Sequence, residues 1–177
     1  ILTENEREGA AMILNHCGDI ILMFDDKGLH GNFTLQPDGH ITYADLKQFY
    51  LVDSTFSVVD SISCKDVFET NKHDFQILPN GHFLMLGSDT LRMDMTGFVF
   101  NNGKPGTTNM LVKASVVQEF DAHKNLVFEW HAKDYLHFSD ADNYFVEPDS
   151  KWTDWIHINS AEMDWDGNII ISVRNSN

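Results

Sequence analysis

The sequence predicts an all-β chain, a segment of a β-propeller made of about three four-stranded antiparallel blades. Three observations predict it: short apolar runs are joined by turn residues, two kinds of turn alternate, and equivalent turns recur at a regular spacing. The turn glycines Gly39 and Gly81 lie 42 residues apart, and Gly167 follows after a further 86. A period of about 40–45 residues with four strands in each repeat is typical of propeller blades.

The two kinds of turn differ in their residues. In the first, an apolar run is followed by Pro-Asp-Gly, Pro-Asn-Gly or Trp-Asp-Gly, at 37–39, 79–81 and 165–167. Proline fixes φ and glycine accepts a positive φ, so each of these segments favours a tight hairpin turn. In the second, an Asp leads the turn, at 53–57 and 121–125, with a truncated copy within 20–28. One hairpin of each kind makes one four-stranded unit.

This alternation divides the chain, a single propeller portion over 1–177, into four parts. We expect a half blade at 10–30, a blade at 31–68, a blade with insertions at 73–133 and a half blade at 154–177. Stretches rich in Gly, Asn, Asp, Ser and Thr at 88–112 and 134–153 are the expected insertions. Such a segment leaves open sheet edges, which pair readily with other strands. The remaining blades of a longer protein, or another chain, would close the ring.

The composition of the chain disfavours some classes of binding partner. The formal net charge is −15, from 12 Lys and Arg against 27 Asp and Glu, which disfavours nucleic acid and anionic membranes. No apolar run approaches the length of about 18 residues that a membrane-spanning helix needs, and no signal peptide is visible at the start. Cys17 and Cys64 are compatible with a disulfide or with free thiols. No Cys-x-x-Cys pair occurs, so we expect no metal site.

The candidate site lies near the C-terminus. His157 and Asn159 precede the turn at 165–167, and Arg174 follows it, so one hairpin brings the three together. Imidazole, amide and guanidinium donors on one rim suit a tetrahedral oxyanion. Counting eight residues back from each turn glycine leads to Gly31, His73 and Asn159. Equivalent blade positions face the central channel, so His73 joins the candidate binding residues.

Each of these residues also has a purely structural interpretation. His157 could form a hydrogen bond to a neighbouring blade, and His73 with Asp74 could be a pair that joins two blades. Arg174 could form an ion pair with one of the many acidic residues. Asn159 could cap a turn.

The segments His73-Asp74-Phe75, Asp154-Trp155-x-His157-x-Asn159-Ser160 and Ser172-x-Arg174 resemble the bacterial arylsulfate sulfotransferases, and the likeness extends over roughly 15–177. The resemblance implies a six-bladed propeller that is periplasmic or secreted. It also implies transfer of a sulfuryl group from a phenolic sulfate ester to a phenol through a sulfated histidine, without PAPS or another cofactor. His73, His157, Asn159 and Arg174 would bind the sulfuryl group.

The family's nucleophilic histidine has no counterpart at any position here. We therefore expect no catalytic nucleophile in this segment and no turnover by the segment alone. Two alternatives stay open: a non-catalytic propeller that binds a ligand or partner, and an assembly module whose open blade edges pair with other chains.

Overall fold

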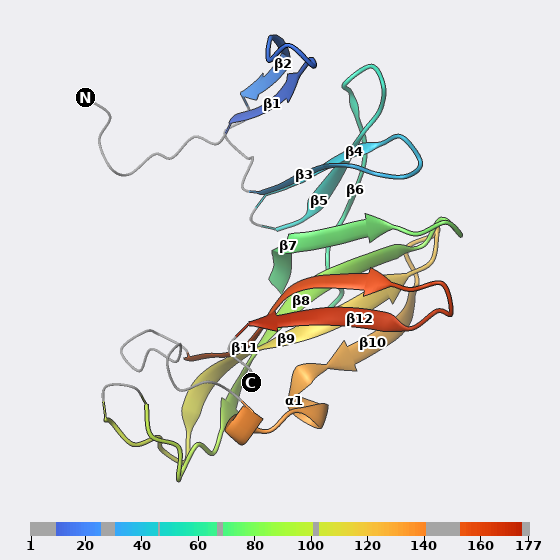
Figure 1. Cartoon of the computed structure of the whole chain (residues 1–177). Coiled ribbons are helices and arrows are strands. Elements are labelled where there is room, and N and C mark those ends of the chain that lie inside the picture. The colour runs from blue at the N-terminus through green and yellow to red at the C-terminus, as the bar shows by residue number, and fades with distance from the viewer. Residues whose placement is uncertain are drawn as a thin grey trace, which may run out of the picture.

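The computed structural model describes residues 10–25, 31–45, 47–66, 69–100, 103–140 and 153–174. Within these ranges the chain is almost entirely β, and its strands form antiparallel sheets that do not close into a barrel. This confirms the predicted fold class. Figure 1 shows the sheets following one another along the chain, from the blue hairpin to the red one.

The first two sheets are small meanders. A separate hairpin pairs β1 with β2, and a four-stranded sheet has the order β3-β4-β5-β6. The bounds of these strands are β1 Ala10–Leu14, β2 Ile20–Asp25, β3 Gly31–Leu35, β4 Ile41–Ala44, β5 Phe49–Val52 and β6 Val58–Ile62.

The third sheet has six strands, in the order β12-β11-β9-β8-β7, with β10 also paired to β9. One edge of β9 is shared: Val112–Ala114 pair with β11 in parallel, and 116–120 pair with β10. The bounds are β7 Glu69–Ile77, β8 Phe83–Met93, β9 Met110–Phe120, β10 Leu126–His131, β11 Thr153–Met163 and β12 Ile169–Arg174, with a short helix α1 Ala132–Tyr135 and a 3-10 turn Phe138–Asp140.

The first expected insertion, 88–112, is partly wrong. β8 continues to Met93 and β9 begins at Met110, and every residue from Ser88 to Met93 pairs with a residue of β9. The polar stretch at 88–93 therefore continues as strand, because it lies directly opposite the more apolar residues 110–115 of β9. Only the segment between these strands leaves the sheet. Of the second expected insertion, residues 141–152 lie outside the described residues.

Two apolar clusters fill the spaces between the sheets. One joins the four-stranded sheet to β7 and β8, where Phe49 stacks on Phe75 with ring centroids 4.7 Å apart. The other lies beneath the β11–β12 hairpin and contains Trp155, Ile156 and Ile158, each at most 1% exposed. Burial of apolar faces between successive sheets is the stabilisation expected of stacked blades.

A buried amide ties the four-stranded sheet to the next one. Gln36 follows β3 and is 4% exposed. Its Oε1 accepts from Ile77 N at 3.0 Å, and its Nε2 donates to Phe75 O at 3.2 Å and to Thr42 Oγ1 at 2.8 Å. The side chain thereby serves as an extra strand residue for β7, whose backbone groups would otherwise be buried without partners.

The two cysteines are both free. Cys17 is exposed in the β1–β2 turn, and Cys64 is buried against β8, where its Sγ donates to Leu86 O at 3.4 Å. Burial raises the pKa of the Cys64 thiol to about 12, so this thiol stays protonated and unreactive near neutral pH.

Within the described ranges, the structure contains no helix with the length and apolar character needed to span a membrane.

Four hairpin turns use one arrangement. The side-chain oxygen of the first turn residue accepts from the backbone N–H groups two and four positions later, for Asn15, Asp53, Asp121 and Asp164. Side-chain hydrogen bonds from Thr55, Asn125 and Asn168, together with these backbone N–H groups, hold the pKa of Asp53, Asp121 and Asp164 below the usual range. The turn at Asn15 shows that an amide oxygen can play the same part.

Gln36→Ala should lower the free energy of unfolding by about 1–3 kcal/mol, because Ile77 N is left buried without an acceptor. Urea denaturation measures this loss. The control is Gln48→Ala, which removes an amide of the same size from a half-buried position on the same sheet. Equal stability of the two variants would show that the hydrogen bonds of Gln36 contribute nothing to the free energy of unfolding.

Acid should destabilise the chain through its turn aspartates. Their folded pKa values lie below the unfolded ones, so their stabilisation is complete above about pH 4 and is lost as pH falls through the folded values. Asp164→Asn should therefore keep most of the stability at pH 7 and unfold less steeply between pH 4 and pH 2. Urea midpoints across this range measure the effect. Asp166→Asn, which removes the same charge from the same turn, is the control; a matching profile would contradict the account.

Candidate functional site

The last hairpin brings two predicted site residues face to face. His157 of β11 is directly opposite Arg174 of β12 in the antiparallel register. Side chains of directly opposed residues lie on the same face of a sheet. The guanidinium and the imidazole therefore project from one side of the hairpin, as the turn chemistry at 165–167 predicts.

The third predicted residue, His73, reaches the same place from β7. The ring centroids of His73 and His157 are 4.9 Å apart, in an edge-to-face arrangement with an interplanar angle of 67°. The strands β3 and β11 both contact β7. The two histidines, 84 positions apart in the sequence, therefore meet because β7 and β11, two strands of the same sheet, also contact each other directly.

Irregular pairing marks these three strands at equivalent places. The register shifts between Gly31 and Thr34 in β3, between Asn71 and Phe75 in β7, and between Ile158 and Ser160 in β11. His73 and Asn159 thus lie in bulges within long strands. A bulge leaves residues unpaired and turns their side chains away from the regular alternation.

Buried side chains hold the strands that carry the histidines. Asp74 accepts from Phe75 N at 3.0 Å through one carboxylate oxygen and from Ala161 N of β11 at 2.9 Å through the other. Burial raises the pKa of Asp74, and these two hydrogen bonds oppose that rise. The structural interpretation of the His73–Asp74 pair is therefore correct for Asp74, which joins β7 to β11.

Ser115 of β9 hydrogen-bonds the backbone near the start of β11. Its Oγ donates to Ile156 O at 2.9 Å and accepts from Ile158 N at 3.1 Å. The two backbone groups flank His157, and the serine is 4% exposed. This hydroxyl completes the hydrogen bonding of β11 where its parallel pairing with β9 ends.

A cavity of about 270 Å³ opens beside the histidine pair. His73 and His157 line it together with Lys72 and Lys113, and so do the acidic groups Asp45, Glu69 and Asp154. Lys113 Nζ lies 3.0 Å from Glu69 Oε2. The lining thus mixes N–H donors of two lysines and two histidines with three carboxylates.

The two imidazoles have different partners. His157 Nδ1 lies 2.6 Å from Asp154 Oδ2, whereas its buried Nε2 has no hydrogen-bond partner among the described residues. Partial burial and the positive charges of His157, Arg174 and Lys72 lower the pKa of His73. The sequence analysis named Asp154 only as part of a motif, and the contact with His157 makes it a further candidate site residue.

Asn159 and Arg174 are not among the residues that line the cavity. Asn159 is half-buried at the bulge of β11, two positions beyond His157. Arg174 is exposed at the end of β12. The structure therefore brings His73 and His157 into contact, places Arg174 beside His157, and leaves Asn159 at the edge of the group.

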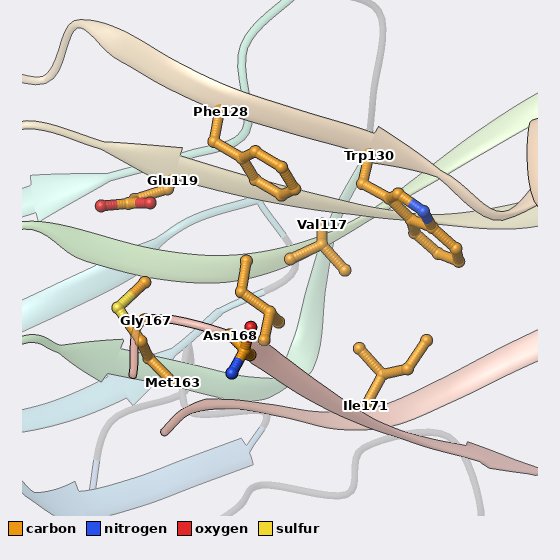
Figure 2. A pocket seen from close by; sticks show the side chains of 9 residues that line it. Val117, Glu119, Phe128, Trp130, Met163, Gly167, Asn168 and Ile171 are labelled. Atoms are coloured by element: carbon orange, nitrogen blue, oxygen red, sulfur yellow. The ribbon is translucent and has the colours of Figure 1, made fainter. Parts of the chain in front are cut away.

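A larger cavity, of about 450 Å³, has a different character. It lies between β9 and β10 on one side and the β11–β12 hairpin on the other, and Figure 2 shows Phe128 and Trp130 facing Ile171 across it. Glu119 and Asn168 are the polar side chains in its lining. It offers apolar surface and a carboxylate, so it does not suit a sulfate-like anion.

No group of three or more His, Cys, Asp or Glu side chains suited to a metal ion occurs within the ranges described above.

Comparison with known families decides the assignment. The family model described as Arylsulfotransferase (ASST) matches residues 1–177. The chain belongs to the arylsulfotransferase family. A comparison with curated proteins gives no match. The match covers both histidines, Asn159 and Arg174 of this arylsulfotransferase-like chain.

Ser115→Ala should disturb the backbone of β11 on both sides of His157. It leaves Ile158 N and Ile156 O buried without partners, at a cost of about 1–3 kcal/mol in unfolding free energy. Urea denaturation measures the cost, and the ring resonances of His157 should shift. Ser88→Ala is the control, because Ser88 is buried, lines the same cavity and pairs directly with Ser115. An equal effect of both substitutions would show that the hydroxyl of Ser115 has no special part.

Proposed function

We propose that this chain is the sulfuryl-binding part of an arylsulfate sulfotransferase. His73, His157, Asn159 and Arg174 bind the sulfuryl group as it passes from a phenolic sulfate ester to a phenol. The observation that carries the proposal is the convergence of His73, His157 and Arg174 from three strands onto one rim beside a cavity. Membership of the arylsulfotransferase family supports aryl sulfates and phenols as the substrates.

The donor set suits the chemistry. Sulfuryl transfer develops charge on three equatorial oxygens, and preorganised donors aimed at them stabilise the transition state. A guanidinium supplies a fixed fork of N–H groups, and an imidazolium supplies a charged N–H. Charge-assisted hydrogen bonds of this kind are about twice as strong as neutral ones.

The nucleophile belongs to another part of the protein in this proposal. A histidine outside this segment takes the sulfuryl group directly from the aryl sulfate, so neither PAPS nor another cofactor takes part. The protein acts in the periplasm or outside the cell. The parts at 10–30, 31–68, 73–133 and 154–177 supply about three blades of a six-bladed ring.

Exposed apolar edges support completion of that ring by further strands. The β1–β2 hairpin is a separate two-stranded sheet in which Met12, Leu14, Ile20, Ile21 and Met23 are each at least 50% exposed. In the described sheets β12 pairs with β11 alone, and its Ile170 is 59% exposed. Such edges pair with other strands. The same observation favours the assembly module as the second candidate function.

Sulfate binding to the purified chain tests the proposal. Isothermal titration at low ionic strength should give measurable binding, and His157→Ala and Arg174→Ala should each weaken it about tenfold or more, since a hydrogen bond to a charged group contributes about 1.5–3 kcal/mol. Arg92→Ala removes the same charge from β8, where Arg92 donates to Asn109 O. Equal loss in all three variants, or no binding at all, would contradict the proposal.

Turnover needs the full reading frame. With it, phenol release from an aryl sulfate in the presence of a phenol acceptor should be abolished by His157→Ala and retained in Arg92→Ala. A stable, complete protein that binds sulfate but releases no phenol would favour the non-catalytic binding propeller instead.

A further inference from the structure

Protonation of both histidines at the cavity at the same time is energetically unfavourable. Their ring centroids are 4.9 Å apart, and Arg174 is placed opposite His157 on the neighbouring strand. Like charges this close disfavour each other's charged forms. When their surroundings move the pKa values of two neighbouring groups apart, one group is charged while the other is neutral, and the two then have different roles.

Asp154 selects which histidine is charged. On a regular strand, residues three apart lie on opposite faces. Here the pairing of β11 with β9 shifts between Asp154 and Ile156, so Trp155 is an extra residue and Asp154 turns to the face of His157. The contact between Asp154 Oδ2 and His157 Nδ1 is 2.6 Å, and 16% of the His157 side chain is exposed.

This contact also determines the orientation of His157. With Nδ1–H donating to the carboxylate, Nε2 is the nitrogen left for a ligand. Nε2 is buried and has no hydrogen-bond partner among the described residues. A buried polar atom without a partner is costly, and an anion oxygen accepting from a protonated Nε2 would satisfy it.

His73 has the opposite surroundings. The charged groups that act on it are His157, Arg174 and Lys72, which disfavour its protonated form, and Asp154, which favours it more weakly. Asp45, Glu69 and Lys113 line the rest of the cavity, and Lys113 is paired with Glu69. His73 therefore has no carboxylate comparable to the one that His157 has at 2.6 Å.

We propose that Asp154 is a positioning residue that keeps His157 charged while His73 stays neutral. The charged His157 Nε2–H faces the sulfuryl oxygens. The neutral His73 keeps a lone pair that can accept a hydrogen bond from the hydroxyl of a phenol. The roles toward ligand rest on the proposed sulfotransferase function, whereas the division of charge within the pair does not.

The test is a pH titration of the ring nitrogens in the ¹⁵N-histidine-labelled chain, followed by NMR from pH 5 to pH 9. His73 should titrate at lower pH than His157, because partial burial and the positive charges near it oppose its protonation. In Asp154→Asn the amide oxygen still accepts from Nδ1–H but the charge is gone. The protonated form of His157 should then be less favoured, because the carboxylate that contacts its ring at 2.6 Å is lost.

Two further variants complete the design. His157→Gln removes the neighbouring charge and should raise the midpoint of His73. Asp38→Asn is the matched control, because Asp38 Oδ2 lies 2.8 Å from His40 Nδ1 in an exposed turn. It should move the midpoint of His40 and leave His73 and His157 unchanged. Coincident midpoints in the unmodified chain, or a His73 midpoint unmoved by His157→Gln, would overturn the proposal.

Sulfate titration of the same samples separates this proposal from the proposed function. Asp154→Asn should weaken sulfate binding about tenfold at pH 7, which corresponds to about 1.4 kcal/mol. Divided midpoints without sulfate binding would refute the sulfuryl site and leave the role of Asp154 intact. Sulfate binding with undivided midpoints would refute the role of Asp154 and leave the site.

Discussion

The whole arrangement depends on polar side chains that complete the backbone hydrogen bonding of neighbouring strands. Gln36 bonds the backbone of β7, Asp74 bonds β11, and Ser115 bonds β11 on both sides of His157. Each takes the place of a missing strand partner, because buried backbone N–H and C=O groups need partners. These bonds also fix the offset of one inner strand against the next. The distance between His73 and His157 follows from that offset.

The bulges then place polar side chains of these strands at the candidate site. A regular strand would send alternate residues into the core, and the core side of β11 holds Trp155, Ile156 and Ile158. The extra residue at Trp155 and the longer irregularity around His73 allow Asp154, His157 and His73 to line the cavity without disturbing the apolar face.

Several features could be predicted from the sequence because they are local. The turn residues at 165–167 set the hairpin and hence the opposition of His157 and Arg174, and equal spacing from the turn glycines grouped His73 with Asn159. Nonlocal pairing could not be predicted. The parallel contact of β11 with β9 and the extension of β8 to Met93 depend on partners far along the chain. The contact of Asp154 with His157 could not be predicted because residues three apart on a regular strand face opposite ways, and no sequence pattern marks the bulge that reverses this.

The central claim is that β7, β11 and β12 bring His73, His157 and Arg174 to one anion-binding rim. The most direct measurement is an NMR experiment on the chain with labelled histidine and arginine. The account predicts a nuclear Overhauser effect between the rings of His73 and His157, and concerted shifts of both rings and of the Arg174 side-chain N–H groups on adding sulfate. Absence of the ring-to-ring effect, or sulfate-induced shifts confined to residues elsewhere, would contradict it.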